Sequence, residues 1–181
     1  METAPGQLIR DAKRGKEAAF LQLFDEHHLP LFRFAWRLTG SVLDAEDVVQ
    51  ECFLALLRPG CGFDPARSSI RTYLFGAVRN QSLKRLQRRE DGMASEPTDS
   101  RTPETETLRT ETADAVTNAI AALPPTQREV LLLAHYEQLS LVEIAEVTQL
   151  EVVAVKSRLQ RARATLRETL AAYAPRMERS K

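Results

Sequence analysis

Apolar residues recur at helical rather than alternating intervals along most of this chain, which predicts an all-α fold. The first helical pattern extends from about Leu8 to Leu38, with Pro30 marking a kink or a break near its middle. A second pattern runs from Asp44 to Leu57 and ends at a Pro-Gly turn, and a third covers about Ser69 to Arg89. The apolar positions of the first two patterns are Phe20, Phe24, Leu31, Phe34, Ala35, Leu38, Val48, Val49, Cys52, Phe53 and Leu56.

The segment from Leu139 to Arg167 predicts a pair of helices with a short connection. Ser140 and Glu143 have the S-x-x-E spacing of a capping box, so a helix should begin at Leu141. This helix should end near Thr148, because residues 149–151 interrupt the apolar pattern before it resumes. The apolar stripe of the second helix has spacings of four, three and four, at Val155, Leu159, Ala162 and Leu166.

The opposite face of that second helix is basic, with no acid between Glu151 and Glu168. It carries Lys156, Ser157, Gln160, Arg161 and Arg163. Two helices joined by a three-residue turn, the second basic on its outer face, are typical of a helix-turn-helix whose second helix enters the major groove. A solvated amphipathic helix is the plain alternative, and Gln149 stands where such turns often carry Gly.

The helix predicted over about Ser69 to Arg89 has the composition of a single-strand binding surface. Basic groups neutralise phosphate, aromatic rings stack on bases, and a side-chain amide such as Asn80 offers a hydrogen-bonding edge. Its rings are Tyr73 and Phe75, and we expect at least one of them to lie in the core instead. No acid interrupts the basic run, which comprises Arg67, Arg71, Arg79, Lys84, Arg85, Arg88 and Arg89.

Between the helical segments the composition changes, and this divides the chain. Asp, Glu, Thr, Ser and Pro dominate residues 91–114, which predicts a flexible acidic linker. The fold class is therefore all-α, with two small helical modules, residues 8–90 and 115–174, and the helix-turn-helix in the second. Within the second module Pro124-Pro125 forces a turn, and Thr126 and Glu129 predict another capping box.

Charge and composition narrow the function classes. Lysine and arginine balance aspartate and glutamate at 25 each, so only the distribution of charge bears on nucleic-acid binding. Nucleotide-binding glycine loops and nucleophile-base motifs are lacking, so we expect no enzyme and no cofactor. The two cysteines and three histidines lack metal-ligand spacing, and the chain has neither a signal peptide nor an apolar run of membrane-spanning length. We expect a cytoplasmic protein without a metal.

Two short segments of the sequence resemble segments of a known protein family. Ala45-Glu46-Asp47-Val48-Val49-Gln50-Glu51-Cys52-Phe53 resembles the core-binding signature of bacterial sigma factors of the sigma-seventy superfamily. LPPTQREVLLL, residues 123–133, resembles the start of their last region. A two-module chain of this length with a terminal helix-turn-helix resembles the extracytoplasmic-function (ECF) group in particular. The resemblance implies a transcription initiation factor that directs core RNA polymerase to promoters by recognising minus-ten and minus-thirty-five elements.

The same resemblance implies the partners of each surface. Core RNA polymerase, through its largest and second-largest subunits, would contact Asp47, Gln50 and Glu51. The minus-ten strand would contact Phe63, Arg71, Tyr73, Arg79, Asn80, Lys84 and Arg85. The minus-thirty-five duplex would contact Lys156, Ser157, Arg158, Gln160, Arg161 and Arg163. An anti-sigma factor is a family-level expectation that no residue identifies.

Energetics independently favour a large protein partner. Separating about ten base-pair steps costs on the order of 14 kcal/mol. One or two bases stacked on aromatic rings return only ~2–6 kcal/mol, so a small protein cannot hold a bubble open alone. Two alternatives stay open: a polymerase-independent helix-turn-helix regulator that binds a palindrome as a dimer, and a sigma mimic that sequesters an anti-sigma factor.

Overall fold

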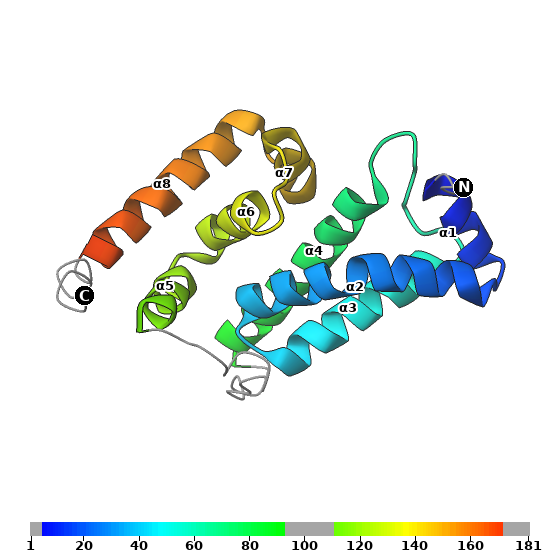
Figure 1. The fold of residues 1–181 in the computed structure, drawn as a ribbon, viewed down its shortest axis with the longest axis horizontal. Helices are drawn as coiled ribbons and strands as arrows, with labels where there is room; N and C mark the ends of the chain where they lie inside the picture. The colour runs from blue at the N-terminus through cyan, green and yellow to red at the C-terminus, as the bar shows by residue number, and fades with distance from the viewer. Residues whose placement is uncertain (1–4, 93–110, 172–181) are drawn as a thin grey trace. The chain divides into compact units, whose positions relative to one another are not determined.

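The protein is described here from a computed structural model, which describes residues 5–92 and 111–171 (Figure 1). Every regular element in these ranges is an α-helix, which confirms the predicted fold class. The chain divides into two compact units, one built mainly from α1 to α4 and the other from α5 to α8. Most of the predicted linker, residues 91–114, lies outside the described residues.

The first unit consists of α1 (Pro5–Lys13), α2 (Glu17–Thr39), α3 (Val42–Leu57) and α4 (Ile70–Glu90). Both α1 and α4 pack against α2, and Figure 1 shows α2 running beside α3. Phe34 of α2 meets Phe75 of α4 edge to face, with ring centroids 5.4 Å apart, and both rings are buried. At the other end of α2, Phe24 meets Phe53 of α3 at 5.1 Å. These aromatic contacts fix the helices that present the candidate surfaces.

Helix α2 passes through Pro30 without a break, contrary to one of the two outcomes expected from the sequence. A proline inside a helix removes one backbone donor and costs about 3 kcal/mol, but the buried residues on either side of it, Leu23, Leu31 and Phe34, offset that cost by packing. The chain breaks instead at Gly15, whose φ of 82° suits glycine and separates α1 from α2.

The predicted inner face of α3 is confirmed, since Val48, Val49, Cys52, Phe53 and Leu56 are all buried. A loop covers residues 58–69, and Ser69 then caps α4 by accepting a hydrogen bond from the Thr72 amide at 3.0 Å. Of the two rings on α4, Phe75 lies in the core and Tyr73 is half-buried, as expected for at least one of them.

The second unit consists of α5 (Glu111–Ala121), α6 (Pro125–His135), α7 (Leu141–Thr148) and α8 (Val152–Ala171). Helices α7 and α8 pack against α6, and α5 packs against α8. Helix α5 begins at Glu111, so the last four residues of the predicted linker are helical. The acidic composition of these residues predicted a linker, but acids such as Asp114 also stabilise the N-terminal end of a helix. Ala115, which follows, is already buried.

The second predicted capping box is wrong. Helix α6 starts at Pro125 with Pro124 as the N-cap, and no side chain caps it. Proline is suited to the first helical position, so the helix begins before Thr126 can act as its cap. The Glu129 side chain, predicted to take part in the capping box, is fully buried.

Candidate functional site

The connection between α7 and α8 has the geometry predicted for a helix-turn-helix. Ser140 Oγ accepts a hydrogen bond from the Glu143 amide at 3.2 Å, and Glu143 Oε2 accepts one from the Ser140 amide at 2.8 Å, which confirms the first capping box. Helix α7 then ends at Gln149, whose φ of 56° and ψ of 39° are left-handed. A non-glycine residue therefore adopts the conformation that usually selects glycine at a helix C-terminus.

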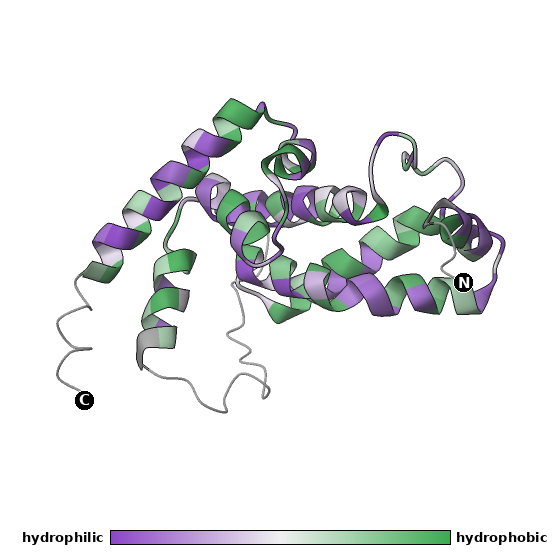
Figure 2. Ribbon diagram, turned by 45° about the horizontal axis from the view of Figure 1, so that its top comes forward, coloured by the Kyte–Doolittle hydropathy of each residue, from purple (hydrophilic) through white to green (hydrophobic). Residues whose placement is uncertain are grey.

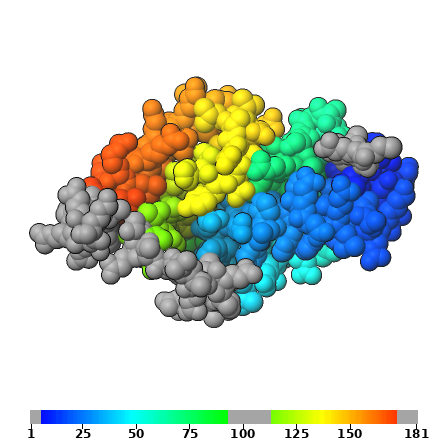
Figure 3. Space-filling model, viewed as in Figure 1, coloured from blue at the N-terminus to red at the C-terminus, as the bar shows by residue number. Residues whose placement is uncertain are grey.

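One face of α8 packs against the other helices of the second unit, and the opposite face is exposed. Val155, Leu159 and Ala162 are buried, while Leu166 is half-buried. Polar and apolar segments alternate around this helix in Figure 2, and α8 lies at the surface in the space-filling view of Figure 3. The exposed side chains of its outer face are Lys156, Gln160, Arg161 and Arg163.

Within that outer face one contact orders a long side chain. The Arg161 guanidinium donates to the half-buried Ser157 hydroxyl at 2.8 Å, one turn earlier on α8. This brings a charged donor and a hydroxyl together at one point of the surface. The arrangement suits contact with a phosphate or a base edge.

Arg158, also expected to face DNA, lies against α6 instead. Its Nη1 donates to Glu129 Oε1 at 3.3 Å, and the Glu129 side chain is 0% exposed. A buried carboxylate needs a charged partner, so Arg158 is held in place by Glu129 in the protein alone. Its guanidinium thus serves the packing of α8 on α6, which sequence spacing could not reveal.

The loop before α4 and the first turns of α4 bring several predicted residues together. The rings of Phe63 and Tyr73 meet edge to face with centroids 5.3 Å apart, and both are half-buried. Burial raises the pKa of the Tyr73 hydroxyl, so it stays a neutral donor. Arg71 lies 5.5 Å above the Phe75 ring. The two partly exposed rings of Phe63 and Tyr73 form a surface on which bases can stack.

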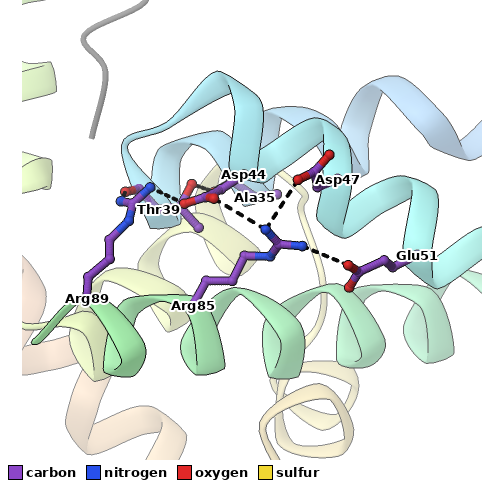
Figure 4. Close-up of polar contacts among 7 residues, drawn as sticks. All are labelled: Ala35, Thr39, Asp44, Asp47, Glu51, Arg85 and Arg89. Atoms are coloured by element: carbon purple, nitrogen blue, oxygen red, sulfur yellow. Dashed lines mark hydrogen bonds and ion pairs between the residues drawn. The ribbon is translucent and has the colours of Figure 1, made fainter. Parts of the chain in front are cut away.

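Further along α4 the remaining predicted residues separate into two sets. Lys84 and Asn80 are exposed, and Arg79 donates to Asn80 Oδ1 at 3.1 Å. Arg85 and Arg89, in contrast, turn toward α3, as Figure 4 shows. Arg89 bonds Asp44 and donates to the Thr39 carbonyl at 3.0 Å, near the end of α2.

The outer face of α3 carries the predicted acidic ridge, which we define as Asp47, Gln50 and Glu51; all three are exposed. Arg85 lies among its carboxylates, with Nη2 2.8 Å from Glu51 Oε1 and Nη1 3.4 Å from Asp47 Oδ2 (Figure 4). Charge repulsion along the ridge is thereby reduced, because a cation from α4 sits between two anions of α3.

Sequence reasoning missed two apolar side chains that flank this ridge. Leu43 is 59% exposed and Leu54 is 52% exposed. With Asp47 and Gln50 they have spacings of four, three and four, so the four residues lie in one line along α3. The same helical period that predicted the inner face could have found this outer line.

The cysteines and histidines make no metal site in the described ranges, where no group of three His, Cys, Asp or Glu side chains could hold an ion. Cys52 is buried among apolar side chains, and burial raises the pKa of its thiol to about 12, so it is a core residue rather than a nucleophile. Among the helices described here, none is long and apolar enough to cross a membrane.

The fold and these surfaces define a class: an all-helical, two-unit DNA-binding protein with a helix-turn-helix in its second unit. Comparison with known families agrees with it. The family model of Sigma-70 region 2 matches residues 23–91, and that of Sigma-70, region 4 matches residues 113–166. The chain is 37% identical over 161 residues to the ECF RNA polymerase sigma factor SigL of Mycobacterium tuberculosis, covering 85% of this chain and 90% of SigL.

Solved structures of other proteins are also similar to this chain. The structure of CnrH in complex with the cytosolic domain of CnrY matches with a TM-score of 0.71 and 30% identity, covering 94% of this chain and 99% of that one. The sigma factor RpoE in complex with the anti-sigma factor NepR from Bartonella quintana matches with a TM-score of 0.68 and 26% identity, over 84% and 96%. This chain belongs to the ECF sigma factors of the sigma-70 family. It is a transcription initiation factor that binds core RNA polymerase and promoter DNA.

Proposed function

We propose that the two units divide promoter recognition between them. Residues 8–90 bind core polymerase and capture the melted minus-ten strand, and residues 115–174 read the minus-thirty-five duplex. The predicted linker, residues 91–114, is shortened at its end by the first turn of α5, which begins at Glu111. The observation that carries this proposal is that the acidic ridge and the basic face of α8 belong to different units. A protein-docking surface and a duplex-binding surface are thus built on separate cores.

The acidic ridge is the proposed docking surface for core polymerase, through its largest subunit, with the second-largest subunit as a further partner. Exposed carboxylates of Asp47 and Glu51 suit a basic partner, and the Gln50 amide supplies a directional hydrogen bond. Leu43 and Leu54 extend the surface at both ends with apolar anchors. An apolar contact beside a charged one is the combination that gives an interface both affinity and register.

The loop before α4 and the outer side of α4 are the proposed site for the minus-ten strand. Phe63 and Tyr73 offer stacking faces, each worth about 1–3 kcal/mol per base. Asn80 and Arg79, already joined by a hydrogen bond, would contact base edges or phosphate. The cations assigned to the backbone of the strand are Arg71, Lys84 and Arg85.

Helix α8 is the proposed reader of the minus-thirty-five element in the major groove. Lys156, Gln160, Arg161 and Arg163 are exposed on one face, and Ser157 is ordered by Arg161. Arg158 is assigned the support of this helix through Glu129 rather than a DNA contact. We expect Lys156→Ala or Arg161→Ala to weaken promoter use, with a lower salt slope where the lost contact is to phosphate.

An anti-sigma factor is the proposed regulatory partner. The similar RpoE is held by the anti-sigma factor NepR in its structure. Because promoter DNA and core polymerase are both bound in the cytoplasm, we assign the protein to that compartment. Its activity is binding rather than catalysis of a reaction of its own.

The decisive experiment compares transcription and promoter opening by this protein alone, by core polymerase alone, and by the mixture. We expect an open complex only in the mixture, and its loss in an Asp47→Ala/Glu51→Ala variant. Lys156→Ala should keep core binding but lose promoter affinity. Tight binding of a palindromic duplex by the protein alone, unaffected by core, would instead indicate a polymerase-independent regulator. Core binding without any promoter-dependent transcription would indicate a sigma mimic.

A further inference from the structure

We propose that Arg85 is shared between the two surfaces of the first unit. In the free protein it pairs with the acidic ridge, and a basic partner docking on that ridge displaces it, making it available to a nucleic-acid phosphate. Docking of core and capture of the strand are then coupled through one side chain. This inference rests on the proposed role of the ridge in core binding.

The position of Arg85 makes it a competitor for the ridge. Its guanidinium contacts Asp47 at 3.4 Å and Glu51 at 2.8 Å, the two acids assigned to core polymerase (Figure 4). Both carboxylates are accessible, with side chains 61% and 51% exposed. A lysine or arginine of the partner that reaches either carboxylate must share it with Arg85 or replace it.

Moving the Arg85 guanidinium off the two ridge carboxylates costs little free energy, because exposed ion pairs are weak. Its contact with the less exposed Asp44, 3.4 Å from Nη1, adds to that cost. The two ridge carboxylates keep much of their hydration, and an incoming cation supplies the charge that Arg85 gives up. Once displaced, Arg85 lies on the same turns of α4 as the exposed cations Lys84 and Arg88. Its side chain can then join them in neutralising the backbone of a strand bound along α4.

Arg89 differs from Arg85 in a way that limits the proposal to one residue. Its side chain is only 15% exposed, and it joins α4 to both Asp44 and the Thr39 carbonyl of α2. Neither partner is a ridge residue, whereas Arg85 contacts two ridge carboxylates in addition to Asp44. Arg89 therefore stays in place as a packing residue while Arg85 exchanges partners.

The test measures two affinities of Arg85→Gln in the full-length protein. The first is for core polymerase, and we expect it to rise roughly threefold to tenfold, because a competitor worth one or two exposed pairs is gone. The second is the affinity of the assembled holoenzyme for a single-stranded minus-ten oligonucleotide, which should fall by a similar factor. A residue with only a structural role would lower both affinities.

Two controls make the result specific. Arg88→Gln removes the same charge from an exposed position one turn away and should leave core affinity within about twofold. In a Glu51→Gln background the gain from Arg85→Gln should shrink, since one partner of the pair is already neutral. Arg85→Lys, which keeps the charge but lacks the forked guanidinium, should give an intermediate core affinity and serves if Arg85→Gln does not fold.

A further variant distinguishes failure of the Arg85 proposal from failure of the proposed docking surface. Gln50→Ala tests the ridge without changing its charge, so unchanged core binding in that variant would overturn the docking surface itself. If Gln50→Ala weakens core binding but folded Arg85→Gln leaves it unchanged or lower, the ridge stands and the sharing of Arg85 is refuted. Opposite changes in the two affinities support it.

Discussion

Removal of the Arg158 side chain should selectively destabilise the second unit. Arg158→Met keeps much of the stem but leaves the Glu129 carboxylate, which is 0% exposed, without the guanidinium 3.3 Å away. Breaking a buried ion pair costs about 3–5 kcal/mol. Arg158 is 27% exposed, so water moderates the loss and we expect about 2–3 kcal/mol. For a unit of this size that lowers the melting midpoint by roughly 10–20 °C.

The chain contains its own internal reference for this measurement. Trp36 is the single tryptophan and lies in α2, so its fluorescence follows the first unit, while far-UV circular dichroism follows all helices. In urea, Arg158→Met should move part of the dichroism transition to lower concentration and leave the tryptophan transition unchanged. An equal shift of both signals, or a loss below about 0.5 kcal/mol, would refute the assignment.

A double variant identifies the cause of the loss. Replacing a buried ion pair with apolar residues of similar volume is often neutral, whereas removing one partner is not. Glu129→Leu/Arg158→Met should therefore recover most of the stability lost in Arg158→Met. If the double variant is as unstable as the single one, the damage comes from lost packing of the Arg158 stem rather than from an uncompensated charge.

Two further predictions concern stability. Gln149→Gly should stabilise the second unit by about 0.5 kcal/mol, because relief of a left-handed non-glycine residue exceeds the added freedom of the unfolded chain; a lower urea midpoint would contradict this. His27 is buried, and burial lowers its pKa below the ordinary 6.5, so the unfolded chain binds the proton more readily. The free energy of unfolding should be constant above pH 6.5 with respect to this group and fall as pH drops through 6.5, and His27→Asn should flatten that fall in urea titrations.

The helix-turn-helix could be predicted closely because its signals are local. Ser140 and Glu143 are three residues apart, and the helix they cap begins and ends where the sequence indicates. The inner face of α3 follows from the helical period alone, whereas for α4 the sequence indicated only that at least one of Tyr73 and Phe75 lies in the core. Such signals depend on neighbours within one or two turns, which the sequence displays directly.

The predictions that were wrong concern positions where local signals compete with one another or with contacts distant in sequence. Thr126 and Glu129 have capping-box spacing, but Pro125 starts the helix earlier and a residue 29 positions away, Arg158, takes the carboxylate. At Pro30 the sequence predicted a kink or a break, and the break does not occur because α2 packs against other helices. The capping box lost to a second local preference, that of Pro125 for the first helical position. The place of the Glu129 carboxylate and the continuity of α2 depend instead on contacts distant in sequence, about which spacing carries no information.

Contacts distant in sequence also decide which of the candidate cations are available to DNA. Both helices that we propose to face DNA give arginines to acids of a neighbouring helix: Arg85 and Arg89 of α4 to Glu51 and Asp44, and Arg158 of α8 to Glu129. Assignment from the sequence therefore overestimates phosphate contacts: of the four α8 cations assigned to the duplex, the structure leaves Lys156, Arg161 and Arg163 on the outer face. At about 0.9 per phosphate, the contribution of α8 to the salt slope should be about −2.7 rather than about −3.6. Arg158→Met, measured where it is still folded, should leave that slope unchanged, while Lys156→Ala should reduce its magnitude by about 0.9 if it meets a phosphate. A reduction of about 0.9 in the Arg158→Met variant as well would mean that Arg158 leaves Glu129 and meets a phosphate when α8 binds its duplex.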